Sequence, residues 1–305
     1  MDIKLHLQTI GMPGHRLAMA ELKPLSGIGR SERETFWSVW TTIEPRRRAE
    51  IAHAMVDLAE DNVDLDFGEA LLWMLDDEDA AVRSSAIDGL WEQDNTRVLR
   101  RLLTMLRSDP APEVRTAVAL TLSRFANLAG LEELSDGDAQ ALHDALLSSL
   151  LDQRQPLDVR RRSLESAGYF EDDDEIQRQI ALAYASDEQL LRESALVAMG
   201  RSMLPRWLPT IAKELDSPSP ALRYEAARAA GEMADHARSL LPKLAQLLND
   251  RDSEVALAAI WALGQIGGSA AKRMLEQIRK TSDDARRQAA VEALEELSLE
   301  DGLFA

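Results

Sequence analysis

The sequence predicts an all-α protein, an α-solenoid in which about seven to eight antiparallel helix pairs stack into a right-handed superhelix. A block made of an acidic or Pro-containing turn, an apolar residue, an arginine and an alanine-rich helix recurs along the chain. The chain of 305 residues is also long for one compact core, and only 5% of it is aromatic. A modular stack of helices accounts for both observations.

The spacing of the repeated arginine sets the register of the repeat. This position falls at residues 83, 115, 160, 192, 223, 256 and 286, at intervals of 32, 45, 32, 31, 33 and 30 residues, and residue 256 is Ala instead of Arg. The long interval predicts an insertion that loops out near residues 128–138, where Gly130 and Gly137 lie. An apolar segment before most turns predicts a second helix in each repeat.

Four regions follow from this register. Residues 1–30 do not fit the repeat, and either cap the first helix pair or dock onto a partner. Residues 31–66 form a divergent helix pair, with Pro45 at a first helical position. Residues 67–297 carry the repeats, and residues 298–305 form a C-terminal tail.

The blocks themselves resemble a known family. Those ending at Arg83 and Arg115 read Asp77-Glu78-Asp79-Ala80-Ala81-Val82-Arg83 and Asp109-Pro110-Ala111-Pro112-Glu113-Val114-Arg115. Over about residues 67–297 this sequence pattern resembles the HEAT repeats, in particular the short repeats named after phycobilisome lyases. Scaffolds, chaperones and a few enzymes share the repeat, so the resemblance implies the fold and leaves the function to the site.

Two packing roles are expected for recurrent residues. The arginines should bond an acid or a carbonyl of the next repeat and so belong to the frame. A stripe of alanines should let neighbouring second helices pack closely. These alanines are Ala86, Ala117, Ala195, Ala226, Ala259 and Ala290.

Charge and composition restrict the partners and the compartment. The 53 acids against 35 bases give a formal charge of −18, whose field opposes nucleic acid despite arginine clusters at 46–48 and 160–162. No run of eighteen apolar residues exists, so no membrane insertion is expected. The lack of cysteine favours a reducing compartment, and we expect a cytoplasmic protein.

Motifs for catalysis are missing from the sequence. The five histidines have no metal-ligand spacing, and the stretch from Ser26 to Arg30 lacks the third glycine of a dinucleotide loop. No cofactor and no catalytic residue are therefore expected.

The sequence favours a non-catalytic scaffold or adaptor that binds another protein on the concave face of the solenoid. The resemblance leaves one alternative, a protein that handles a tetrapyrrole as the bilin lyases do. A helical-repeat protein that binds nucleic acid is the second alternative.

Two surfaces are candidates for partner binding. Positions one, four, five and eight after each arginine should face solvent, unless curvature or the N-terminal segment covers them. Residues 61–79, with eight acids and no base, form a candidate acidic edge for a basic partner or simply a solvated face. The concave-face residues are Ile87, Trp91, Leu120, Leu164, Leu196, Tyr224, Arg228, Leu257, Ile260 and Trp261, and the edge residues are Asp64, Asp66, Asp76, Asp77 and Asp79.

Overall fold

The computed structural model describes residues 3–303 except for residues 63, 92 and 282, and within that part of the chain every regular element is a helix. The helices of the first half are α1 (Ile3–Ile10), α2 (Arg33–Trp40), α3 (Pro45–Asp61), α4 (Gly68–Met74), α5 (Ala80–Asp88), α6 (Thr96–Ser108), α7 (Pro112–Gly130) and α8 (Asp136–Leu151). Those that follow are α9 (Leu157–Ala167), α10 (Asp174–Tyr184), α11 (Gln189–Arg201), α12 (Leu208–Glu214), α13 (Pro220–Glu232), α14 (Leu241–Leu247), α15 (Ser253–Ile266), α16 (Gly268–Thr281) and α17 (Asp284–Leu303). Short 3₁₀ helices are η1 (Met19–Glu21), η2 (Lys23–Leu25), η3 (Arg30–Glu32), η4 (Pro205–Trp207) and η5 (Ala234–Leu240). No helix of the described residues is both long and apolar enough to cross a membrane.

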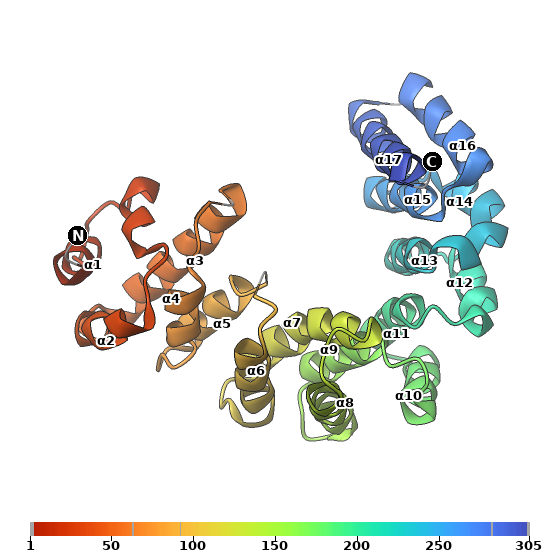
Figure 1. Ribbon diagram of the computed structural model, residues 1–305. Coiled ribbons are helices and arrows are strands. Elements are labelled where there is room, and N and C mark those ends of the chain that lie inside the picture. Colours follow the sequence, from red (N-terminus) through yellow and green to blue (C-terminus); the bar gives the residue numbers. More distant parts are fainter. Residues whose placement is uncertain (1–2, 63, 92, 282, 304–305) are drawn as a thin grey trace. The chain divides into compact units, whose positions relative to one another are not determined.

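The chain divides into two compact units, residues 1–160 and 161–305. In most helix pairs an even-numbered helix, here called a first helix, packs on the odd-numbered second helix that follows it. In the first unit α4 packs on α5 and α6 on α7, and in the second unit α10 packs on α11. The second helices then contact one another in series, α3 to α5 to α7 in the first unit and α11 to α13 to α15 to α17 in the second (Figure 1). This arrangement confirms the predicted stack of helix pairs.

The second helices from α3 to α15 bury a stripe formed by positions three, four and seven after the repeat arginine, or after Ala256 in its place. On a helix these positions lie side by side and form one face. The alanines predicted for close packing are fully buried at Ala86, Ala195, Ala226, Ala259 and Ala290. Ala117 is half-buried, because it lies one residue short of the stripe and Val118 takes the buried place.

Three of the repeated arginines, Arg83, Arg115 and Arg223, donate to the turn of the next repeat, as predicted. Arg83 donates to both carboxylate oxygens of Asp109, at 2.9 and 2.8 Å, and to the carbonyl oxygen of Asp77 in its own turn at 2.8 Å. Arg223 binds Asp250 in the same way, through two hydrogen bonds of 2.8 Å. The guanidinium holds the pKa of Asp250 below its usual range.

The series of repeat arginines, here called the arginine ladder, begins one repeat earlier than the sequence pattern indicates. Arg48 is buried, and donates to the Ile43 carbonyl at 3.0 Å and to Asp77 of the next repeat at 3.1 Å. It follows Pro45 by three residues, as Arg115 follows Pro112, and this spacing is the signal that could have identified it. Further along, where Ala256 interrupts the pattern, Arg286 donates to the Asp250 carbonyl at 3.0 Å.

The structure differs from the expected chain organisation in two places. The long interval does not produce a looped-out insertion at 128–138, because α7 continues to Gly130, α8 begins at Asp136, and five residues connect them. The surplus residues lengthen these two helices instead. The predicted tail also does not begin at residue 298, since α17 continues to Leu303.

The N-terminal segment packs on the first helix pair. Helix α1 contacts α2, and η1 contacts α3. Arg47 Nε donates to the Ile10 carbonyl at 2.8 Å, and the Gly27 N–H donates to the Asp66 carbonyl at 2.7 Å. The apolar residues that this packing buries are Leu7, Ile10, Leu22 and Leu25.

Candidate partner-binding surfaces

Four residues predicted for the exposed face are buried. They all occupy position four after the repeat arginine, or after Ala256 in its place, which belongs to the core stripe with positions three and seven. Their side chains therefore pack between second helices and cannot form a partner-binding surface. The four residues are Ile87, Leu164, Leu196 and Ile260, each with no exposed area.

Positions one and five lie mostly outside the core stripe. Position eight is open at Trp91 but buried in four later repeats, where it is Gly168, Gly200, Gly231 or Gly264. In the first unit, Trp91 is 50% exposed in the turn that follows α5, and Leu120 is 44% exposed on α7. Exposed large apolar side chains are common one at a time, so these two mark a candidate surface without defining what covers it.

The corresponding face of the second unit, here called the second-helix face, lies on α11, α13 and α15. The Arg228 guanidinium carbon of α13 lies 3.6 Å from the centre of the Trp261 ring of α15, a cation–π contact. Gly231 makes room for the indole, because a Cβ there would overlap the ring. Tyr224 on α13 and Leu257 on α15 are half-buried. Each directly follows the repeat position of its helix, which is Arg223 in α13 and Ala256 in α15.

Three carboxyl groups also gather on this side of the second unit. Glu165 accepts a hydrogen bond of 2.5 Å from the Ser194 hydroxyl and one of 2.7 Å from Arg162, and it is buried. Burial, together with the nearby charges of Glu165 and Glu193, raises the pKa of Glu225 to about 7. Sequence reasoning missed this cluster, because its members follow their arginines by five, one and two residues and share no spacing.

The candidate acidic edge is not a free negative surface. Asp77 is buried, where it binds Arg48 and accepts a hydrogen bond of 2.6 Å from the Trp40 indole. Asp76 pairs with Arg33 and Arg101, at 2.8 and 2.6 Å.

Local backbone contacts use two further acids of the edge. Asp79 caps the start of α5, and Asp66 accepts from the Gly68 N–H at 2.8 Å. Asp64 is exposed. The segment has no base of its own, but helices distant in sequence supply arginines to it, and a charge count along the chain cannot show this.

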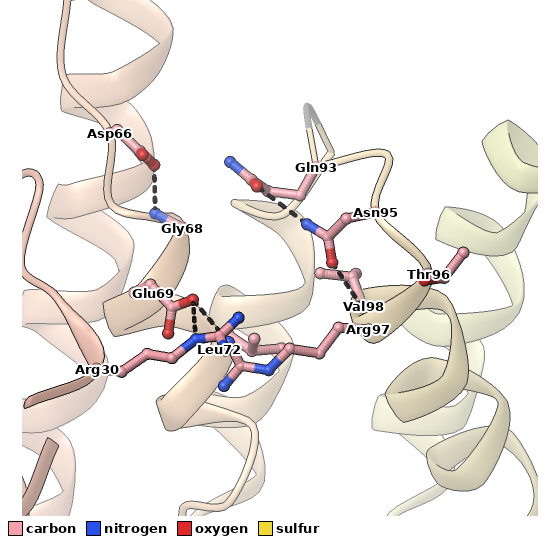
Figure 2. Close-up of a pocket in the computed structure, with 10 residues that line it drawn as sticks. All are labelled: Arg30, Asp66, Gly68, Glu69, Leu72, Gln93, Asn95, Thr96, Arg97 and Val98. Atoms are coloured by element: carbon pink, nitrogen blue, oxygen red, sulfur yellow. Dashed lines mark hydrogen bonds and ion pairs between the residues drawn. The ribbon is translucent and has the colours of Figure 1, made fainter.

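A hollow of about 380 Å³ lies where η3, α4 and the start of α6 meet in the first unit. Figure 2 shows Arg30 and Arg97 converging on one carboxylate oxygen of Glu69, at 3.5 and 2.6 Å. Asn95, whose Oδ1 accepts the Val98 N–H at 3.1 Å, caps α6 at the other wall. The polar groups of this hollow mainly bind one another, so it is a structural junction.

Arginines of the two clusters, residues 46–48 and 160–162, form ion pairs within the protein. Besides Arg48, Arg47 pairs with Glu50 at 3.0 Å, and Arg161 and Arg162 pair with Glu165 at 3.5 and 2.7 Å. Among the residues that the structure describes, no group of three or more acidic or histidine side chains is placed to hold a metal ion.

Helix pairs stacked in series through their second helices place this chain in the class of α-solenoid repeat proteins. The profile described as HEAT repeats matches residues 68–148 and 208–295, together 169 of the 305 residues. The chain belongs to the HEAT repeat family. No curated protein sequence matches it.

Several solved structures are similar in fold. The complex of CpcE and CpcF of phycocyanin lyase from Nostoc sp. PCC7120 aligns with a TM-score of 0.51 and 17% identity, over 75% of this chain and 94% of that chain. An engineered protein aligns over 97% of this chain and 88% of its own, with a TM-score of 0.40 and 17% identity. A designed armadillo repeat protein covers 65% of this chain and 99% of its own, with a TM-score of 0.38 and 18% identity. At these identities the likeness concerns the fold alone.

Proposed function

We propose that this protein is a non-catalytic scaffold that binds another protein on the second-helix face of its second unit. The observation that carries the proposal is the Arg228–Trp261 pair, which is partly exposed and joins α13 to α15. Arginine, tryptophan and tyrosine are the residues that most often dominate the binding energy of protein interfaces. Tyr224 and Leu257 add further half-buried apolar area to the same helices.

A basic side chain is the favoured partner group next to Glu225. The carboxyl group of Glu225 resists ionisation because it is poorly hydrated and lies near two other acids. An incoming ammonium or guanidinium would favour the ionised form, and binding would then lower the pKa of Glu225. The overall charge of −18 would also accelerate the approach of a basic partner.

Site-specific crosslinking tests the proposal, and the cysteine-free chain suits it. Leu257→Cys, on the second-helix face, and Leu182→Cys, which is exposed on the first helix α10, each receive a benzophenone maleimide. In extracts of the native host, the label at residue 257 should crosslink a discrete protein that the label at residue 182 does not.

The crosslinked partner must also depend on the proposed contact. Arg228→Ala in the Leu257→Cys background should weaken its capture at least tenfold while the melting temperature stays within a few degrees. Equal crosslinking from both labelled positions, or capture that is unchanged by Arg228→Ala, would show that the partner binds elsewhere.

A further inference from the structure

The second-helix face of the second unit has two chemically different halves. Its apolar half is formed by Tyr224 of α13 and by Leu257 and Trp261 of α15, which are all partly exposed. Its acidic half is formed by Glu193 of α11 and Glu225 of α13, whose side chains are also partly exposed. A ligand that covers both halves must therefore combine apolar and basic groups.

The two acids of this face have no base of their own. Glu193 accepts a hydrogen bond of 2.7 Å from a neutral side-chain amide of its own helix. Neither Glu193 nor Glu225 forms an ion pair with any residue that the structure describes. Arg228, on the same helix as Glu225, pairs instead with Glu232 at 3.8 Å and stacks on the Trp261 ring. An incoming cation would thus meet two carboxylates that no arginine or lysine of the chain neutralises directly.

Neighbouring second helices pack closely enough for one short segment to span both halves. A Cβ at Gly200 of α11 would lie 2.8 Å from the Ala229 Cα of α13, and Gly231 allows a similar approach between α13 and α15. Helices packed in this way lie about 8–10 Å apart. A cation held between Glu193 and Glu225 lies between α11 and α13, and therefore about one and a half spacings, or roughly 12–15 Å, from α15.

The face is narrow in the direction of the helix axes. Tyr224 and Arg228 are one helical turn apart on α13, as Leu257 and Trp261 are on α15. One turn rises about 5.4 Å, which is close to the width of an extended chain, about 4.8 Å, whereas a helix with its side chains is about 10–12 Å wide. An extended chain also advances about 3.3 Å per residue, so side chains four residues apart lie on the same side and about 13 Å from each other.

We propose that this face accepts an extended segment of the partner in which a basic residue and a large apolar residue are four positions apart, an inference that rests on the proposed function. The basic group lies between Glu193 and Glu225, and the apolar side chain packs on Leu257 and Trp261. In a helical segment, residues four positions apart are only about 6 Å from each other along the axis, so they would not reach both halves.

The probe is a nine-residue peptide of serine and threonine, blocked at both ends, with lysine at its centre and leucine at each end. It presents the proposed spacing in both chain directions. It is titrated into the ¹⁵N-labelled full chain at pH 7.5, above the pKa of about 7 of Glu225. The indole N–H resonance of Trp261 should shift and saturate at millimolar concentration.

A second peptide, with each leucine moved one position toward the lysine, tests the spacing. Its leucines point away from the side that the lysine faces, so it should bind about fivefold more weakly. An unmoved Trp261 resonance with the first peptide, or equal Kd values for the two peptides, would overturn the proposal.

Carboxylate variants give the residue-level test. Glu193→Gln and Glu225→Gln should each weaken the Kd for the lysine peptide about threefold, and leave unchanged the Kd for a peptide with norleucine in place of lysine. Asp187→Asn, an exposed acid in the turn before α11, is the matched control and should change neither Kd. Equal losses for both peptides, or no loss in either glutamate variant, would refute the acidic half of the site.

The crosslinking experiment at residue 257 judges the proposed function separately. A partner that is captured there while the lysine peptide does not bind would overturn this inference and leave the proposed function standing. A peptide that binds as expected without any captured partner would contradict the proposed function alone.

Discussion

Arg83 holds Asp109 through two parallel hydrogen bonds of 2.9 and 2.8 Å, and so ties α5 to the turn before α7. The two side chains are 8% and 5% exposed, so water does not compete effectively for the pair. Replacing both members of a buried ion pair by apolar residues is often neutral or even stabilising, but the loss of one member leaves an uncompensated charge in the interior.

Arg83→Met should therefore lower the free energy of unfolding by about 3–5 kcal/mol. The matched control is Arg154→Met, because Arg154 also binds an aspartate, Asp152, with a side chain that is 91% exposed. This control should cost no more than about 1 kcal/mol. Urea denaturation of both variants measures the difference, and equal losses would show that the arginine ladder does not support the fold.

Substitution by alanine at Gly231 and at Gly137 should change the free energy of unfolding in opposite directions. A Cβ at Gly231 would overlap the Trp261 indole, so Gly231→Ala should destabilise by about 1–3 kcal/mol and change the tryptophan emission. Gly137 lies in α8 with nothing near its missing Cβ, so Gly137→Ala should stabilise by about 0.5–1 kcal/mol through helix propensity. Thermal melts of the two variants check the signs. A stable Gly231→Ala chain with unchanged emission would mean that the indole is free to move away.

The sequence predicts the repeat well because the same kind of helix face is buried in repeat after repeat. A core stripe and an arginine that reaches the next turn recur with the helical period, and Val82, Arg83 and Ala86 already show the pattern. The pattern fails where the register depends on three-dimensional neighbours. In the sequence Arg48 belongs to a run of arginines typical of a surface, and only the structure shows that it binds Asp77. A surplus of residues can also lengthen helices as easily as it forms a loop.

The candidate surfaces were harder to predict for the same reason. Assigning position four to the exposed face placed Leu164 and Leu196 there, because a helix in isolation does not show how wide its buried stripe is. Trp261 and Arg228 lie 33 residues apart in sequence, and Gly231 is what lets them meet. The pKa of Glu225 is raised by its burial and by acids on two other helices.

The former acidic edge should separate into structural and free acids. Asp77→Asn should destabilise by about 2–4 kcal/mol, because Arg48 is buried and would lose the charge of its buried partner, keeping only the exposed Glu78. Asp64→Asn, at an exposed position of the same segment, should change stability by less than about 0.5 kcal/mol. Denaturant midpoints of the two variants measure this, and similar values would contradict the buried role of Asp77.

Glu225 should make the stability depend on pH near neutrality. Its pKa is raised from 4.5 to about 7 in the folded chain, so between these values the folded state holds a proton that the unfolded state releases. The favourable contribution is complete below pH 4.5 and is lost as the pH rises through 7. Glu225→Gln mimics the protonated form at every pH, so at pH 8 it should exceed the parent in stability by on the order of 1–3 kcal/mol and match it near pH 4.5. Urea denaturation at pH 5, 6, 7 and 8 tests this against Glu295→Gln, an exposed control on α17. Parallel pH profiles for the parent and Glu225→Gln would show that Glu225 ionises in the folded chain as freely as in water.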